Sequence, residues 1–216
     1  MSAGGSASAR AAALRAAARK GWWRRVLAWL GVGGRATRRA DARAALWSHG
    51  AAGEERTARL LAELQAQGWV VWHDLMLYGR RFNLDHVLIS PCGTAVVVLD
   101  TKAWRRTWTT GLLHGRVYCG PDDRHNQVEK VASYAQAVAG VAGLRPAAVR
   151  PLIVVHGSPV AGGFLEVMTP HGLVRVLSPE SLVPTLVNGA GAADLWRAGA
   201  LAEQVGRVLS PYVDRG

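Results

Sequence analysis

Apolar residues recur at spacings of three and four along the segment Ala44–Gln67, which predicts a helix ended by Gly68. The segments Gln127–Ala142 and Ala193–Leu209 show the same helical pattern. A further helix is expected to start at Ser178-Pro179-Glu180, because Ser caps helices well and Pro is favoured at the first helical position.

Short β-rich segments bounded by turn residues lie between these helices. They are expected at Trp69–Leu75, Phe82–Ser90, Ala95–Lys102, Gly111–Cys119, Val149–Val155 and Val174–Leu177. The segment Ala95–Lys102 begins with an almost solid apolar run, which indicates a strand buried on both faces. The order of helices and strands predicts an α/β or α+β fold with a central mixed β-sheet flanked by helices.

Polar residues follow the apolar run of the third predicted strand. Residues two apart face the same side of a strand, so Asp100 and Lys102 project together while Thr101 points away. A tight turn at Pro91–Thr94 makes the second and third strands antiparallel. Centring this turn places Asp100 opposite a residue near Asp85, so two carboxylates are expected to meet beside a lysine.

This combination of residues predicts phosphodiester hydrolysis. Adjacent carboxylates repel unless a cation neutralises them, and such oxygen ligands suit Mg²⁺ or Mn²⁺. A divalent metal can lower the pKa of a bound water and stabilise charge on a phosphodiester. Lys102 can orient or deprotonate the attacking water, or stabilise the developing negative charge. The chain has only three lysines among its 26 Lys and Arg residues, so a lysine at position 102 is unusual for this sequence. Its presence favours a chemical role, because lysine can release a proton and arginine cannot.

Several motifs, in this order, resemble the nuclease-related domain (NERD) family. They are Gly50-Ala51-Ala52-Gly53-Glu54, Asn83-Leu84-Asp85-His86-Val87, Val97-Val98-Leu99-Asp100-Thr101-Lys102-Ala103-Trp104 and Asn126-Gln127. That family is similar in its sheet and site to the PD-(D/E)xK nucleases, so the resemblance implies a restriction-endonuclease-like core and a metal-dependent nuclease acting on DNA.

The resemblance also implies a role for five residues. Asp85 would be the central metal ligand, Asp100 the second acid of the signature and Lys102 its lysine. Glu54 would be the helix-borne acid that reaches the metal, and Gln127 would complete the site.

The chain departs from the family pattern at two positions. Asp100 stands where Glu is commoner, and Ala103 stands where Asn is commoner. Aspartate is an accepted form of the signature, whereas Ala103 removes a polar contact. An alternative is a nucleic-acid-binding or partner-binding module with little turnover on the same fold, although a decayed site should have lost one of its acids.

The sequence Trp104-Arg105-Arg106-Thr107-Trp108 follows the signature directly. Interleaved Arg and Trp can bind backbone phosphates and stack on bases, so Trp104, Arg105 and Arg106 are candidate nucleic-acid contacts. A β-hairpin with aromatic packing across its strands explains the same pattern.

The formal net charge of +11 is concentrated in residues 1–45, which carry ten Lys or Arg against one acid. We therefore divide the chain into an Ala/Arg/Trp-rich extension, residues 1–43, and a nuclease-like domain, residues 44–216. Within residues 20–40, Trp22, Val26 and Trp29 share one side of a helical wheel. This segment can lie on an anionic membrane surface, dock on a partner or grip phosphates, or it can be a poorly ordered terminus.

Cellular location is inferred from the cysteines and from apolar runs. The chain has two cysteines, Cys92 and Cys119, which is typical of a reduced chain. It shows no secretory signal and no apolar run of about 18 residues. We expect a cytoplasmic protein, with peripheral membrane attachment through the extension as the alternative.

Overall fold

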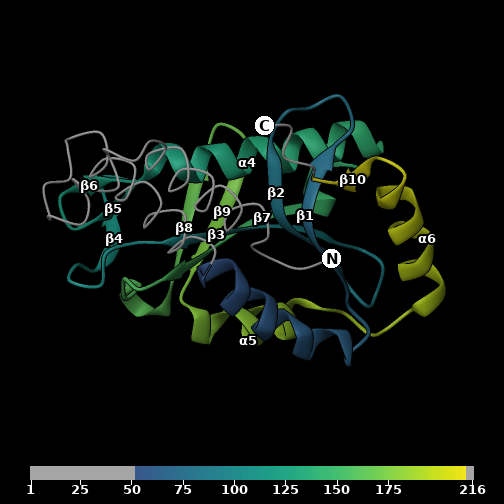
Figure 1. Ribbon diagram of the computed structural model, residues 1–216, viewed down its shortest axis with the longest axis horizontal. Coiled ribbons are helices and arrows are strands. Elements are labelled where there is room, and N and C mark those ends of the chain that lie inside the picture. Colours follow the sequence, from purple (N-terminus) through teal and green to yellow (C-terminus); the bar gives the residue numbers. More distant parts are fainter. Residues whose placement is uncertain (1–51, 213–216) are drawn as a thin grey trace, which may run out of the picture.

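The computed structural model describes residues 52–212, in which a seven-stranded mixed sheet lies between helices (Figure 1). The predicted basic extension, the boundary at residues 43 and 44, and the first turns of the helix expected from Ala44 lie outside the described residues.

The strand order of the large sheet is β10-β1-β2-β3-β7-β9-β8. The strands are β1 (Val70–Leu77), β2 (Asn83–Ile89), β3 (Val96–Ala103), β7 (Val149–His156), β8 (Phe164–Thr169), β9 (Gly172–Leu177) and β10 (Leu209–Pro211). β3, β7 and β9 run parallel, whereas the remaining neighbours pair antiparallel. The predicted mixed sheet and α+β class are therefore confirmed.

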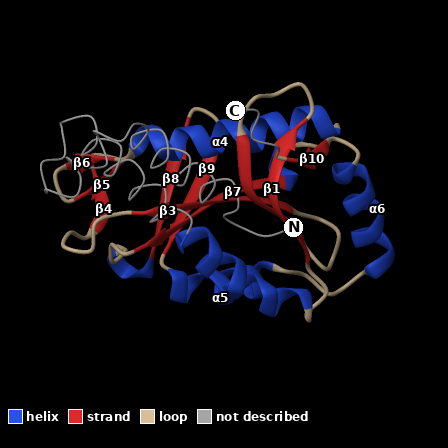
Figure 2. Cartoon of the chain, viewed as in Figure 1, coloured by secondary structure: helices blue, strands red, loops and turns tan. Residues whose placement is uncertain are grey.

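Helices cover both faces of this sheet (Figure 2). One face carries α4 (His125–Ala142), and the other carries α5 (Pro179–Gly189) beside the helix at residues 52–65. Another helix, α6 (Leu195–Gly206), lies at one end of the molecule, and short 3₁₀ turns occupy Pro146–Ala148 and Ala161–Gly163. No helix in residues 52–212 is long and apolar enough to cross a membrane.

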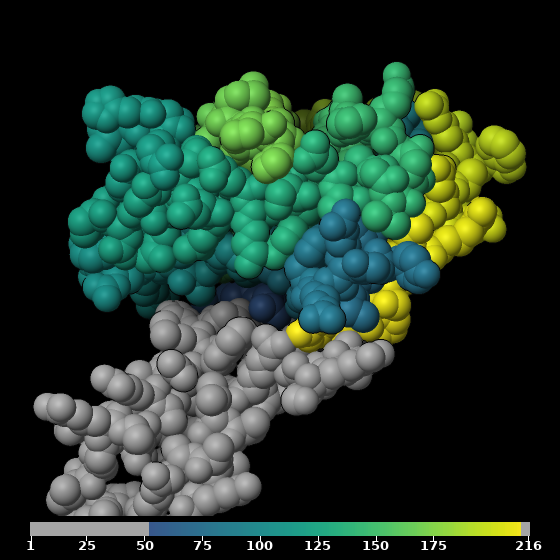
Figure 3. Space-filling view, turned by 90° about the horizontal axis from the view of Figure 1, so that it is seen from above, coloured from purple at the N-terminus to yellow at the C-terminus, as the bar shows by residue number. Residues whose placement is uncertain are grey.

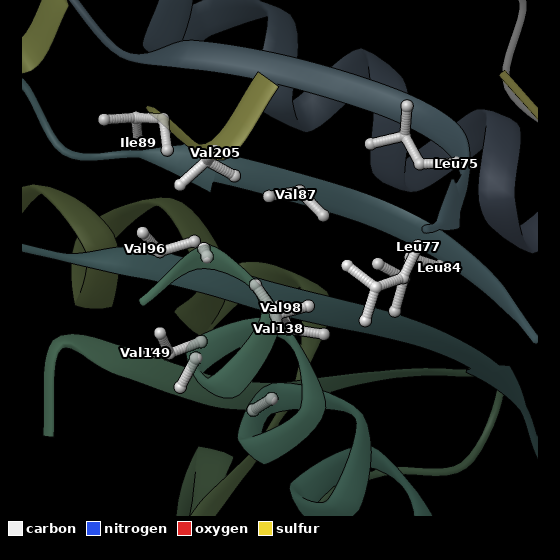
Figure 4. Close-up of a cluster of buried hydrophobic side chains, with 13 residues drawn as sticks. Leu75, Leu77, Leu84, Val87, Ile89, Val96, Val98, Val138, Val149 and Val205 are labelled. Atoms are coloured by element: carbon white, nitrogen blue, oxygen red, sulfur yellow. The ribbon is translucent and has the colours of Figure 1, made fainter. Parts of the chain in front are cut away.

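Strand β3 is buried on both faces, as its apolar run predicts. Val96 and Val98 join Val138 of α4 in one core cluster (Figure 4). Val97 and Leu99 pack on the other face with Leu61 and Leu182, among others, from helix 52–65 and α5. The alternation continues past the core, so Asp100 and Lys102 follow the α4 side and Thr101 follows the other.

A small antiparallel sheet extends one end of the molecule, opposite the end that carries α6 (Figure 3). It consists of β4 (Thr110–Leu113), β5 (Arg116–Cys119) and β6 (Asp122–Asp123). The β-rich segment predicted at Gly111–Cys119 is divided into the antiparallel strands β4 and β5, and the turn between them uses left-handed backbone at His114 and Gly115.

Two sequence predictions about the C-terminal region were wrong. The final helix was expected to reach Leu209, but α6 ends at Gly206 because Leu209 pairs with Leu77 at the edge of β1. Strand β8 was not predicted, although its residues alternate between exposed and buried. Its outward face carries the exposed apolar residues Phe164 and Met168, which obscure that alternation in the sequence.

Candidate active site

The two signature carboxylates lie on adjacent strands. β2 and β3 pair antiparallel with His86 opposite Leu99, so Asp85 and Asp100 occupy the next position along the ladder. The backbone N–H of Thr101 donates a hydrogen bond of 2.8 Å to Asp85 Oδ2. The register predicted from the tight turn is therefore confirmed, and it brings Asp85 to the carboxyl end of β3.

Lys102 forms an ion pair with Asp100, two residues before it on the same face of β3. Burial acts to lower the pKa of Lys102, but the charges of Asp100 and Asp85 outweigh it and raise the pKa. The ammonium group is therefore protonated at neutral pH. This state suits a role in stabilising negative charge or orienting water, and it disfavours proton abstraction by the free side chain.

The pKa of Asp85 lies well above its ordinary value, because burial and then the charge of Asp100 oppose ionisation. Glu54, in the first turn of helix 52–65, is affected in the same way. Burial, followed by the charges of Asp74 and Asp100, raises the pKa of Glu54 to about 7. These acids lie near one another with more negative charge than Lys102 neutralises.

The carboxylates fit a divalent cation bound by few protein ligands. In residues 52–212, no three His, Cys, Asp or Glu side chains form a closed metal-binding group. However, Mg²⁺ is commonly held by one or two carboxylates together with water and substrate phosphate. Asp100 Oδ2 is buried, and its contact among the described residues is the ion pair with the Lys102 ammonium group. A cation shared by Asp85 and Asp100 would relieve the repulsion that raises the pKa of Asp85.

Gln127 lies in the first turn of α4, next to Trp104. Its side-chain Oε1 accepts a hydrogen bond of 3.2 Å from Trp104 Nε1. Trp104 is only 5% exposed and belongs to the core cluster between β7 and α4, so its ring offers no open face for stacking on a base. Its observed contact instead fixes Gln127 near the end of β3.

The two arginines after Trp104 are exposed. The Arg105 guanidinium lies over the ring of Trp108, 5.0 Å from its centroid. Arg106 points to a pocket at the end of β7. Both arginines are therefore accessible to a ligand, whereas the aromatic residues beside them are partly or fully buried.

Asp74 is an additional acid that the sequence analysis did not identify. It is buried in the middle of β1, at the position opposite Asp85 in the β1–β2 ladder, and its φ of 50° is left-handed. Its charge contributes to the raised pKa of Glu54. Its Oδ1 accepts a hydrogen bond of 3.5 Å from the side-chain Nδ2 of Asn83. A buried Asp with strained backbone is typical of functional sites, but a lone Asp in a strand carries no motif that identifies it.

The opposite face of β3 carries a chain of neutral polar side chains that sequence analysis also missed. Thr101 Oγ1 donates to Thr57 Oγ1 (3.0 Å), and Thr57 Oγ1 lies 2.8 Å from His156 Nε2. In the other direction, His86 Nε2 lies 3.3 Å from Thr101 Oγ1, and His73 Nδ1 lies 2.7 Å from His86 Nδ1. The chain connects β1, β2, β3 and β7 to helix 52–65.

The direction of each hydrogen bond in this chain follows from proton counting. Because Thr101 gives its hydroxyl proton to Thr57, His86 Nε2 must donate to Thr101. The hydroxyl proton of Thr57 is then free to be donated to His156 Nε2. Burial is the main cause of a pKa of about 3 for His86, which is therefore neutral, so its Nδ1 accepts from His73. The four hydrogen bonds of the chain are thus made without any net charge.

This chain fixes the helix that carries Glu54. Thr57 lies one turn after Glu54, and its hydroxyl joins the helix to β3 and β7. At Gly53 the helix approaches β3 so closely that a Cβ atom would lie 3.3 Å from Thr101 Cγ2. A small residue at Gly53 and a hydroxyl at Thr57 thus set the position from which Glu54 reaches the acids.

Comparison with protein families gives a match over half of the chain. A family model described as the nuclease-related domain matches residues 49–156. These residues include helix 52–65, which carries Glu54, and run to the end of β7, so they contain all five predicted site residues. No curated protein and no solved structure matches the chain.

Proposed function

Because the chain belongs to the nuclease-related domain family, we propose that it is a metal-dependent nuclease that hydrolyses phosphodiester bonds, with DNA as its substrate. A nuclease-related function follows from the family itself, whereas metal dependence, the choice of DNA and the residue roles are part of the proposal. The observation that carries it is the juxtaposition of Asp85, Asp100 and Lys102 at the end of β3.

Asp85 and Asp100 would hold Mg²⁺ or Mn²⁺, with Glu54 supporting the ion directly or through water. Bound there, the metal would supply an acidified water and a positive charge beside the phosphodiester. The Thr101 N–H orients the Asp85 carboxylate by its hydrogen bond. Lys102, already protonated, would stabilise negative charge that develops on the phosphate oxygens. Gln127, held by Trp104, would orient the water or a phosphate oxygen.

Cleavage of plasmid and linear DNA tests this proposal. The purified protein is incubated with Mg²⁺, Mn²⁺ or EDTA, beside Asp85→Ala and Lys102→Ala. We expect cleavage that needs the metal and falls at least ~100-fold in both variants, since each loses charge stabilisation in the transition state. Equal cutting by the variants would refute the residue roles. No cutting of DNA or RNA by the wild type would leave the binding-module alternative in its place.

A further inference from the structure

A pocket lined by arginines lies near the carboxylates of the candidate active site, at the carboxyl ends of β3 and β7. It is a pocket of about 620 Å³ between the end of β7, helix 52–65 and the start of α5. Its lining includes Arg56, Arg59, Arg106, His156, Ser158 and Glu180. The pocket opens on the face of the sheet that carries the threonine–histidine chain, with His156 as the shared residue.

The charge of this pocket is positive, because its lining has three arginines and one carboxylate, that of Glu180. Arg56, Arg59 and Arg106 are exposed, and within residues 52–212 none of them forms an ion pair or a side-chain hydrogen bond. By contrast, Arg116 and Arg175 each pair with a carboxylate. Three guanidinium groups around one hollow repel one another, which favours an anion bound between them.

The backbone brings Arg106 to this hollow by a close crossing. Gly157, directly after β7, has a φ of 90°, and a Cβ there would lie 2.4 Å from the Trp104 carbonyl oxygen. The same added Cβ would lie 3.6 Å from Arg106 Cγ. The segment after β3 therefore crosses the end of β7 and places Arg106 opposite the arginines of helix 52–65.

The pocket and the candidate active site share their supporting elements. Lys102 pairs with Val155 across the parallel β3–β7 ladder, so the signature lysine lies beside the strand end that lines the pocket. Arg56 is two residues after Glu54 on the same helix. A polyanion that crosses the carboxyl edge of the sheet could thus reach both sites together.

We infer that this pocket binds a backbone phosphate of the nucleic-acid strand, close to the phosphodiester cleaved at Asp85 and Lys102. Guanidinium groups recognise phosphate through paired N–H donors, and such contacts position a strand without reading its sequence. The inference rests on the proposed function and deepens it, because it assigns substrate binding to Arg56 and Arg59, which lie outside the signature motifs.

The test compares two triple variants of equal charge in the full chain. The pocket variant is Arg56→Gln/Arg59→Gln/Arg106→Gln. The matched control is Arg145→Gln/Arg150→Gln/Arg197→Gln, in which three exposed arginines away from the pocket are replaced. Circular dichroism and thermal unfolding establish that both fold. Binding of a labelled oligonucleotide is measured by fluorescence anisotropy with Ca²⁺ across a salt series, and kcat/KM for cleavage is measured with Mg²⁺.

We expect the pocket variant to lose about tenfold or more in affinity and in kcat/KM, and its slope of log affinity against log salt to fall by about 2–3. The affinity and kcat/KM of the control should change far less. Residues 1–43 are the same in both variants, so any contribution of this basic extension to binding is the same in each. Equal losses in the two variants, or none in either, would overturn the inference while wild-type cleavage still upheld the nuclease. A wild type that neither binds nor cuts nucleic acid would overturn the proposed function itself.

Discussion

On the α4 side of β3, Asp85, Asp100 and Lys102 form a charged group in which burial and mutual repulsion raise the pKa of Asp85. On the opposite side of the same strand, Thr101, Thr57 and the histidines form a neutral hydrogen-bonded chain. The first cluster destabilises the fold unless a cation is present, whereas the second stabilises it. The difference supports the proposal that the charged side is the site of chemistry and that the neutral side holds it in place.

The largest effect on stability is expected from removing the Lys102 charge, which pairs with Asp100 and acts to lower the pKa of Asp85. Lys102→Met should lower the free energy of unfolding by about 2 kcal/mol at pH 8, because a partly buried carboxylate pair loses its counter-charge. The loss should be smaller at pH 5 than at pH 8, because the raised pKa of Asp85 means that this carboxylate loses its charge at a higher pH than an ordinary aspartate. Denaturant unfolding at both pH values checks this, and a loss independent of pH would contradict it.

A smaller loss of stability is expected from a substitution in the neutral threonine–histidine chain. Thr57→Val keeps the shape of a fully buried side chain but removes the hydroxyl between Thr101 and His156, which should cost about 1–2 kcal/mol. The loss should be the same at pH 7 and pH 9, since the histidines are neutral throughout.

Thr57→Ser is the matched control for this position, because it restores the hydroxyl and lacks only a methyl group. It should recover most of the cleavage rate lost in Thr57→Val, since the hydroxyl holds the helix that carries Glu54. Equal cleavage by the valine variant and the wild type would show that the chain does not position the active site.

The smallest effect on stability is expected from Glu54→Gln, and this substitution should stabilise the fold. Glu54 has a pKa of about 7 in the fold and an ordinary value of 4.5 in the unfolded chain. The unfolded chain therefore releases this proton first, and stability falls as pH rises from about 4.5 to about 7. Without metal, Glu54→Gln should thus be more stable than the wild type by about 1 kcal/mol above pH 7, and equal to it near pH 4. Urea unfolding in EDTA measures this difference, and a less stable variant at pH 8 would disprove the electrostatic cause.

The charged side was accessible from sequence because it depends on local rules. Alternation along β3 places Asp100 beside Lys102, and one tight turn sets the register that brings Asp85 to them. Glu54 and Gln127 came from the family resemblance alone, since nothing in the spacing of these residues brings them to β3.

The neutral side could not be predicted, because its contacts join segments distant in sequence. Thr57 and His156 are 99 residues apart and meet only when helix 52–65 packs across β7. Trp104 shows the same dependence: beside two arginines it suggested a base-stacking surface, but packing of α4 and the small sheet buries its ring. Sequence patterns identify residue types suited to chemistry, whereas tertiary packing decides which of them solvent and substrate can reach.

The most direct test of the account is Asp85→Asn, measured for stability and cleavage in parallel. Asparagine keeps an oxygen that can accept the Thr101 N–H, but it removes a buried charge. We predict that the variant is at least as stable as the wild type in EDTA at pH 8, and that it loses metal-dependent cleavage. A variant that cuts DNA at the wild-type rate, or that unfolds at a lower urea concentration, would contradict the claim that this carboxylate serves chemistry at the expense of stability.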